Sequence, residues 1–205
     1  MNPLRRPFQI IRADLRAYLL INALIYAMFF LGMALALIFP DLHAARTSSF
    51  VDGDQGALVE TVIGTPWIFG TTIFVVNVFA TALPLIVLPS LVIPFAGLAV
   101  FAIKTIDIGI MLAPVDQTTA LILIPHSLTV LIEFQAYALV MFGAYLLGRS
   151  WLRPTTVGAT TRRQAYARGL SRLGWLWLPA LALFVIGAVY EAFEIYFLVP
   201  LVLGV

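Results

Sequence analysis

Long apolar stretches constrain this chain more than any other feature of its sequence. One of them runs from Leu121 to Gly148, and about 20 apolar residues in a helix already cross the hydrocarbon core of a bilayer. Of the 205 residues, 62% are hydrophobic and 11% are charged, whereas a soluble domain has roughly 45–50% apolar and about 25% charged residues. We therefore expect a single integral membrane domain over residues 1–205.

The apolar stretches divide into five expected spans, so the predicted fold class is all-α, a polytopic bundle of transmembrane helices. A β-barrel would need alternating segments of ~10 residues, and these stretches are continuous. Residues 67–113 are too many for one span and contain Pro84, Pro89 and Pro94. Because proline interrupts helices, we expect a hairpin that turns near Pro89, although a partly re-entrant hairpin stays open. The expected spans are 17–39, 67–87, 91–113, 119–147 and 175–203.

The charged residues indicate how the spans are oriented. All arginines except Arg46 fall either before the first span or between the last two. Cytoplasmic flanks carry an excess of Arg and Lys, whereas residues 40–66 contain most of the acidic residues that lie outside the spans. We therefore predict a multi-pass protein of the cytoplasmic membrane with its N-terminus inside and its C-terminus outside. The loop over 40–66 is then extracytoplasmic, with a short surface helix near Leu58.

The cytoplasmic loop over residues 149–174 is predicted to contain a basic amphipathic helix. Tyr166, Leu170 and Leu173 recur at helical spacing, and arginines occupy the other faces. Such a helix lies on anionic lipid or docks a partner protein, and the topology accounts for the arginines without a nucleic acid. The candidate docking or lipid-binding residues are Arg162, Arg163, Arg168 and Arg172.

Six ionisable residues fall inside the predicted spans. A charged side chain at the centre of a bilayer costs at least ~2.5 kcal/mol, so each should have a partner or a task. Glu133 is expected to face the bundle toward spans three and five, where it would meet Lys104 or Glu191. Lys104 and Asp107, one helical turn apart, can also pair with each other. The predicted polar cluster, structural or functional, is Lys104, Asp107, His126, Glu133, Glu191 and Glu194.

The other residues of the fourth predicted span favour close packing. Gln135 lies two residues after Glu133 and is expected on the opposite side of the helix. Ala136, Gly143 and Gly148 are small residues of the kind that lets membrane helices approach closely.

Catalytic and metal sites are not expected. The chain has no cysteine and two histidines, and Ser127 follows His126 directly, so the two side chains point ~100° apart on a helix. The sequence also lacks the zinc-protease, nucleophile-elbow and phosphate-loop motifs. We expect a non-enzymatic protein with no catalytic residue, no metal, no cofactor and no nucleotide-binding module of its own.

Short motifs in the second half of the chain resemble the stage II sporulation protein M family of integral membrane proteins. Residues 125–127 (Pro-His-Ser) are similar to the family's Pro-His-Gly at the entrance of a span, and 133–136 (Glu-Phe-Gln-Ala) to its following glutamate and alanine. Residues 187–193 are similar to its last span. The resemblance implies a membrane scaffold or assembly subunit. Its partners would be other membrane proteins, an ATPase subunit or cell-wall enzymes, or a second copy of the chain.

The intramembrane carboxylates keep a second function open. Four carboxylates and one lysine cannot all be ionised in a dry bundle, so some must be protonated or face water. That arrangement is typical of a transporter, either the membrane subunit of an ATP-driven exporter or a proton-coupled carrier. Assembly subunit is the first prediction and transporter component the alternative.

Overall fold

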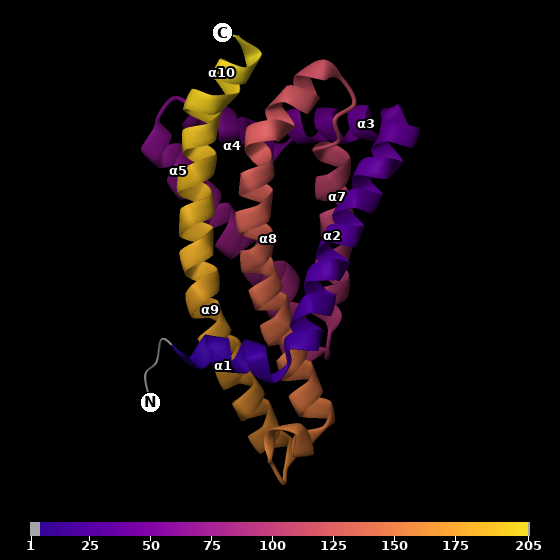
Figure 1. Ribbon diagram of the computed structural model, residues 1–205, viewed down its shortest axis with the longest axis vertical. Coiled ribbons are helices and arrows are strands. Elements are labelled where there is room, and N and C mark those ends of the chain that lie inside the picture. Colours follow the sequence, from indigo (N-terminus) through magenta and orange to yellow (C-terminus); the bar gives the residue numbers. More distant parts are fainter. Residues whose placement is uncertain (1–4, 205) are drawn as a thin grey trace.

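The computed structural model describes residues 5–204, and within that range it contains helices and turns but no strand. Four helices are long and apolar enough to cross a membrane, namely Leu15–Ile38, Pro66–Val92, Gln117–Leu152 and Arg162–Leu203. In Figure 1 Leu15–Ile38, Gln117–Leu152 and Arg162–Leu203 stand side by side, and Pro66–Val92 runs behind them. The predicted all-α class is confirmed, while the count of five spans and their orientation stay predictions.

The helices follow one another along the chain with short connections. The long helices of the bundle are α2 (Leu15–Ile38), α5 (Pro66–Val75) continued by η2 (Val76–Val87) and α6 (Leu88–Val92), α7 (Ala96–Met111), α8 (Gln117–Leu152), and α9 (Arg162–Phe193) continued by η4 (Glu194–Leu198) and α10 (Val199–Leu203). The shorter helices are α1 (Arg6–Ala13), α3 (Pro40–Val51), α4 (Asp54–Val62) and the 3₁₀ turn η3 (Pro154–Val157).

Large apolar side chains cover the outside of the bundle. Trp67 is 82% exposed, Leu201 75% and Ile103 69%. Water would penalise so much contiguous apolar surface, whereas lipid would not. The outward-facing residues therefore agree with a protein embedded in a membrane.

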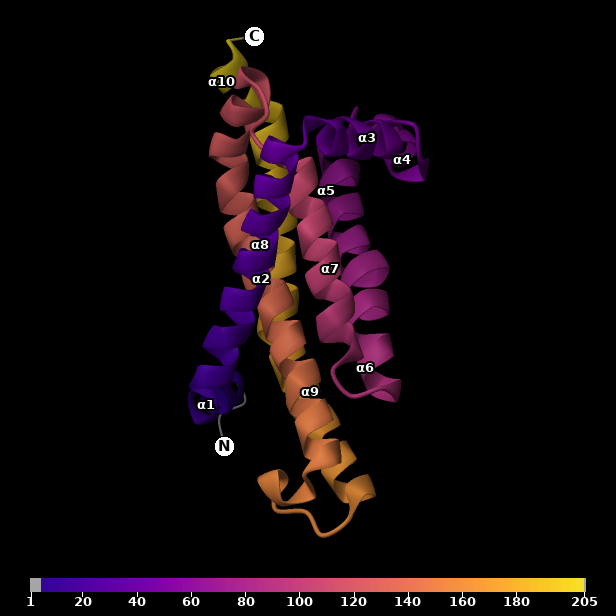
Figure 2. The ribbon, with the colours of Figure 1, turned by 90° about the vertical axis from the view of Figure 1, so that its right-hand side faces the viewer.

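The turn between the second and third predicted spans lies later in the chain than predicted. α5, η2 and α6 form one continuous helix through Pro84 and Pro89, and the chain turns at residues 93–95, where Phe95 adopts a left-handed φ of 68°. The segment around Pro84 is π-helical, and such local adjustments re-satisfy backbone groups that proline leaves free. From this turn α7 runs back to the end where α3 and α4 lie (Figure 2).

The basic segment before the last predicted span also differs from the prediction. It is not a separate surface helix, because α9 runs without interruption from Arg162 to Phe193 after an N-cap by Thr161. α8 in turn continues to Leu152, so α8 and α9 form a long antiparallel hairpin. The tip of this hairpin projects beyond every other part of the bundle (Figure 2).

Short helices lie across both ends of the bundle (Figures 1 and 2). α4 contains the helix expected near Leu58, whereas α3 beside it was not predicted. α1, at the opposite end, was not predicted either, and it buries Pro7 and Ile10. Asp14, directly after α1, accepts two hydrogen bonds from Arg149 at 2.7 and 2.6 Å, which ties this end to α8.

Small residues set the closest approaches between helices. A Cβ atom added at Gly32 or Gly109 would overlap the backbone of the facing helix, so α2 and α7 touch there. Gly143 faces Leu173 of α9, and Gly148 faces Phe95, which confirms the expected role of these two glycines. Ala136 is fully buried. α8 is the central helix, because it contacts α2, α6, α7 and α9 and is the most buried of the four long helices.

Candidate functional site

A polar cavity of about 260 Å³ lies among α3, η2, α7, α8 and α9, in the half of the bundle nearer α3. Its apolar lining includes Val76, Val130 and Phe134. Its polar lining residues are Arg46, Asn77, Thr81, Lys104, Asp107, His126, Glu133, Tyr137 and Glu191. Five of the six residues in the predicted polar cluster therefore face one cavity, and the sixth, Glu194, lies directly behind it.

Glu133 sits on the α8 side of the cavity and is held by η2. Its Oε1 accepts a hydrogen bond from the amide nitrogen of Asn77, and the amide oxygen of Asn77 accepts one from the Tyr137 hydroxyl at 2.8 Å. The expected pairing with Lys104 is wrong. Glu133 faces the cavity and α9, which contains the fifth predicted span, as expected. It also faces η2, in the second predicted span, which was not expected.

Glu191 lies on α9 against the carboxylate of Glu133. Space for this pair comes from Gly187, one helical turn earlier, where an added Cβ would lie 2.9 Å from Glu133 Cγ. None of the four ion pairs formed within residues 5–204 includes Glu133 or Glu191. The alternative expectation, a contact between these two glutamates, agrees with the structure.

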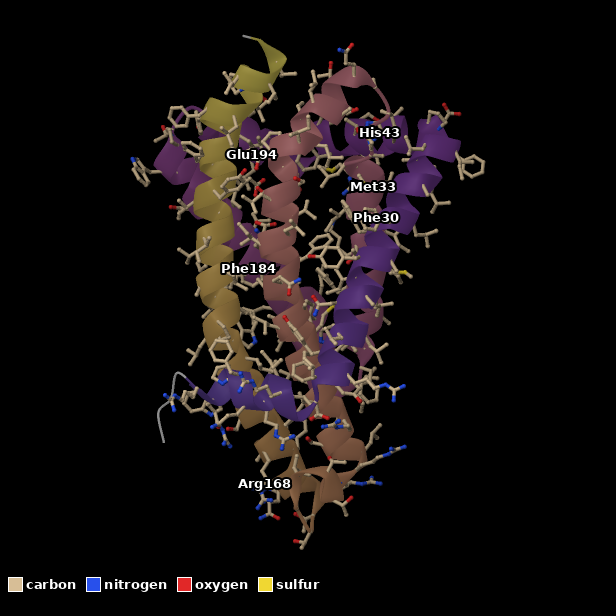
Figure 3. All side chains as sticks on the ribbon, viewed as in Figure 1. Phe30, Met33, His43, Arg168, Phe184 and Glu194 are labelled. Atoms are coloured by element: carbon tan, nitrogen blue, oxygen red, sulfur yellow. The ribbon has the colours of Figure 1, made fainter. Side chains whose placement is uncertain are left out.

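His126 lines the cavity and pairs with Glu194, which lies behind it. His126 Nδ1 lies 2.7 Å from Glu194 Oε1, and the Thr129 hydroxyl donates to Glu194 Oε2 at 2.5 Å. Glu194 is completely buried. In Figure 3 it is labelled between α9 and α8, in the same half of the bundle as His43 and far from Arg168.

The facing wall belongs to α7 and α3. Asp107 binds Lys104 Nζ at 2.8 Å, as predicted from their spacing, and is also held by the guanidinium of Arg46. His43 adds a contact of 2.9 Å to the carbonyl of Ile110. Both fixed cations of the cavity are therefore committed to one carboxylate, and these contacts attach α3 over the end of α7.

On the other side of α8, Gln135 forms a second polar cluster with α2. It accepts a hydrogen bond from Tyr18 at 3.0 Å and donates to Asn22 Oδ1 at 2.8 Å and to Tyr26 at 3.2 Å. The predicted opposite orientation of Gln135 and Glu133 is confirmed. This second cluster contains no carboxylate, lysine, arginine or histidine.

The four arginines predicted as a docking or lipid-binding surface lie on the first turns of α9. Arg162, Arg163 and Arg168 are exposed, and Arg172 is half-buried. Arg168 donates to the carbonyl of Val157 at 2.6 Å, which closes the tip of the hairpin. Arg168 lies at the end of the bundle opposite Glu194 and His43 (Figure 3).

Several residues of the site were not predicted. Arg46 was noticed only as the one arginine outside the two clusters, and its partner Asp107 is 61 positions away. Asn77 is a polar residue in an apolar stretch, and Tyr137 follows Glu133 at i+4, which puts both on one helix face. These sequence features mark Asn77 and Tyr137 as residues of interest, but neither feature shows that Asn77 binds both Glu133 and Tyr137.

The arrangement suits binding of a small polar solute or of protons. Within residues 5–204, no three His, Asp or Glu side chains gather in a way that could hold a metal ion. A larger groove of about 550 Å³ lies between α5 and α9, and no carboxylate, histidine, lysine or arginine lines it. A pocket of about 430 Å³ beside α1 is lined by Asp14, Arg16 and Arg149, and there Asp14 and Arg149 pair with each other. The polar cavity is the one that contains the carboxylates predicted within the membrane spans.

No family model, no curated protein and no solved structure matches this chain.

Proposed function

We propose that the chain is a five-span protein of the cytoplasmic membrane with its N-terminus inside. The charge distribution supports this orientation, because α1 and the α8–α9 hairpin carry the arginines at one end and α3 and α4 carry aspartates at the other. A single cysteine placed at position 52 should react with a membrane-impermeant thiol reagent from outside, and one at 168 only from inside. Labelling of position 52 from the cytoplasmic side would overturn the orientation. The chain has no native cysteine to compete.

We further propose that the protein works as the membrane component of a transporter, with no enzymatic activity of its own. The observation that carries this proposal is the cavity of about 260 Å³ that contains two adjacent carboxylates, Glu133 and Glu191, without a cationic partner. Ionisable groups inside a membrane bundle are typical of substrate, ion and proton pathways. A purely structural cluster would be expected to pack closely, with no cavity between its side chains.

Proteoliposomes with a trapped pH-sensitive dye test this proposal. Separate pools of small organic cations, zwitterions, anions and neutral solutes are added outside, and solute-driven proton movement is recorded. Wild-type protein should respond to at least one pool, Glu133→Gln should not, and the exposed Glu60→Gln should match wild type. Equal traces for wild type, Glu133→Gln and empty liposomes with every pool would contradict the proposal.

A second candidate function, a scaffold or assembly subunit, is favoured by the projecting α8–α9 hairpin. Its tip carries Arg162, Arg163 and Arg168 away from the rest of the bundle, where a partner protein could reach them. The resemblance to the stage II sporulation protein M family agrees with this role, with an ATPase subunit or cell-wall enzymes as partners.

Co-purification from membranes of the native organism, followed by mass spectrometry, tests the scaffold. Replacing Arg162, Arg163 and Arg168 together by glutamine should release the partner without unfolding the bundle. Retention of every partner by this triple variant would contradict docking through the hairpin.

A further inference from the structure

Glu191 is the group in the cavity that still requires a partner. It lies deep in the bundle and lines the cavity, and its one side-chain neighbour of hydrogen-bonding type is the carboxylate of Glu133. Among the described residues, no backbone or side-chain donor is directed at it. Two adjacent carboxylates in such surroundings cannot both stay charged unless a cation or a shared proton lies between them.

The cations already present in the cavity are not available to this pair. Lys104 and Arg46 both bind Asp107 on the facing wall. His126 pairs with Glu194. When the histidine is protonated, its positive charge is therefore next to Glu194 and not between Glu133 and Glu191. Among the described residues, Glu133 and Glu191 therefore form no ion pair, and His126, which also lines the cavity, acts on Glu191 only through its charge.

The remaining lining indicates what kind of cation fits. A hard metal ion such as Ca²⁺ takes six to eight oxygen ligands, and Phe134, Val130 and Val76 supply none. Tyr137 also lines the cavity, and its hydroxyl is held by Asn77, which fixes the orientation of the ring. Carboxylates beside aromatic rings and aliphatic side chains are the pattern that binds organic ammonium ions.

We infer that the cavity binds a small protonated amine, with its ammonium group between Glu133 and Glu191 and its alkyl part against Phe134 and Tyr137. This inference rests on the proposed function in that both use the same cavity, and it names the class of solute. The amine enters as a cation, and the proton shared by the two carboxylates leaves to water. The volume of about 260 Å³ suits an amine of a few carbon atoms.

Binding of propylammonium to the purified full-length protein tests the inference. Calorimetry in lipid nanodiscs should show saturable binding with release of a proton, detected in weakly buffered solution. Sodium ion, propionate and 1-propanol, which lack the ammonium group, should not bind to the same site. Absence of saturable propylammonium binding, or equal competition by sodium ion, would overturn the assignment.

Matched variants separate binding from folding. Glu133→Gln and Glu191→Gln should each weaken propylammonium binding by at least about tenfold, because each removes one charge in direct contact with the ammonium. Lys104→Gln should strengthen binding several-fold, since it removes a repelling cation from the facing wall. Glu60→Gln, on the surface helix α4, should bind like wild type. Wild-type affinity in folded Glu133→Gln and Glu191→Gln would overturn the inference.

The binding experiment and the transport experiment test separate claims, so one claim can be overturned while the other stands. Propylammonium binding without any solute-driven proton movement would retain the amine site and remove the transport role. Proton movement driven by anions or neutral solutes, without propylammonium binding, would retain transport and overturn the amine as ligand.

Discussion

Two polar clusters flank α8 at the same depth, and they are built differently. Gln135 and its α2 partners Tyr18, Asn22 and Tyr26 are neutral, and each polar group of Gln135 has a partner. Glu133 and Glu191 are ionisable and line a cavity. A satisfied neutral network locks helices together, whereas ionisable groups beside a cavity inside a membrane bundle are typical of substrate and proton pathways. The first cluster is therefore expected to be structural, and the second is the one on which the proposed function rests.

The strongest way to break this comparison is to place a carboxylate on the closed side. Gln135→Glu should lower the free energy of unfolding by at least ~2.5 kcal/mol, because the hydrogen-bond partners of this position are the neutral Tyr18, Asn22 and Tyr26. Unfolding by SDS titration, followed by helical circular dichroism, measures the change. Glu133→Gln is the matched control and should cost far less, since the amide keeps the shape of the side chain. If Gln135→Glu is as stable as wild type, the two sides do not differ as described.

A smaller effect is expected from closing the cavity side sterically. Gly187→Val places a branched side chain against Glu133 and Ile132, and overpacking of this kind typically costs about 1–3 kcal/mol. It should also abolish propylammonium binding, because the Glu133 side chain is displaced. Gly174→Val has open space around the added atoms and serves as the control. Unchanged binding in Gly187→Val would show that Glu133 is not positioned through this glycine.

Removing a hydrogen bond from the closed side should have a modest effect on stability alone. Asn22→Ala deletes the acceptor of the Gln135 amide, and interhelical hydrogen bonds of this kind are worth ~0.6 kcal/mol on average. Propylammonium binding should stay at the wild-type value. Asn77→Ala, on the cavity side, should instead alter binding because it frees Glu133. A large loss of binding in Asn22→Ala would show that the two clusters are coupled.

The smallest effect is expected at the N-cap of α8, outside both clusters. Asp116 accepts a hydrogen bond from the Thr119 backbone N–H at 2.8 Å, and this bond lowers the pKa of its carboxyl. Because the folded-state pKa lies below the unfolded one, the stabilisation is present at neutral pH and is lost as the pH falls through the folded-state pKa. Asp116→Ala should slightly lower the melting temperature at neutral pH and leave it unchanged in strong acid. An equal decrease at both pH values would contradict a charged cap.

The local properties of this protein could be predicted from its sequence. Long apolar stretches determine helices in a membrane, because every backbone polar group in lipid must be satisfied within the helix. Helical periodicity determines that Gln135 and Glu133 point apart and that Lys104 reaches Asp107. Each of these relations involves residues on one helix, so no knowledge of neighbouring helices is needed.

Partners on different helices were decided only by the tertiary structure. Glu133 meets Asn77 and not Lys104, and Glu194 meets His126 across 68 positions of sequence. These pairs depend on which helices become neighbours, and that is set where glycines allow backbones to touch, as at Gly109. The turn after α6 and the unbroken α9 were also mispredicted for a physical reason. In a bundle, packing can keep a helix continuous through Pro89, where the isolated chain would be expected to break, and can join the basic segment and the last span into one helix.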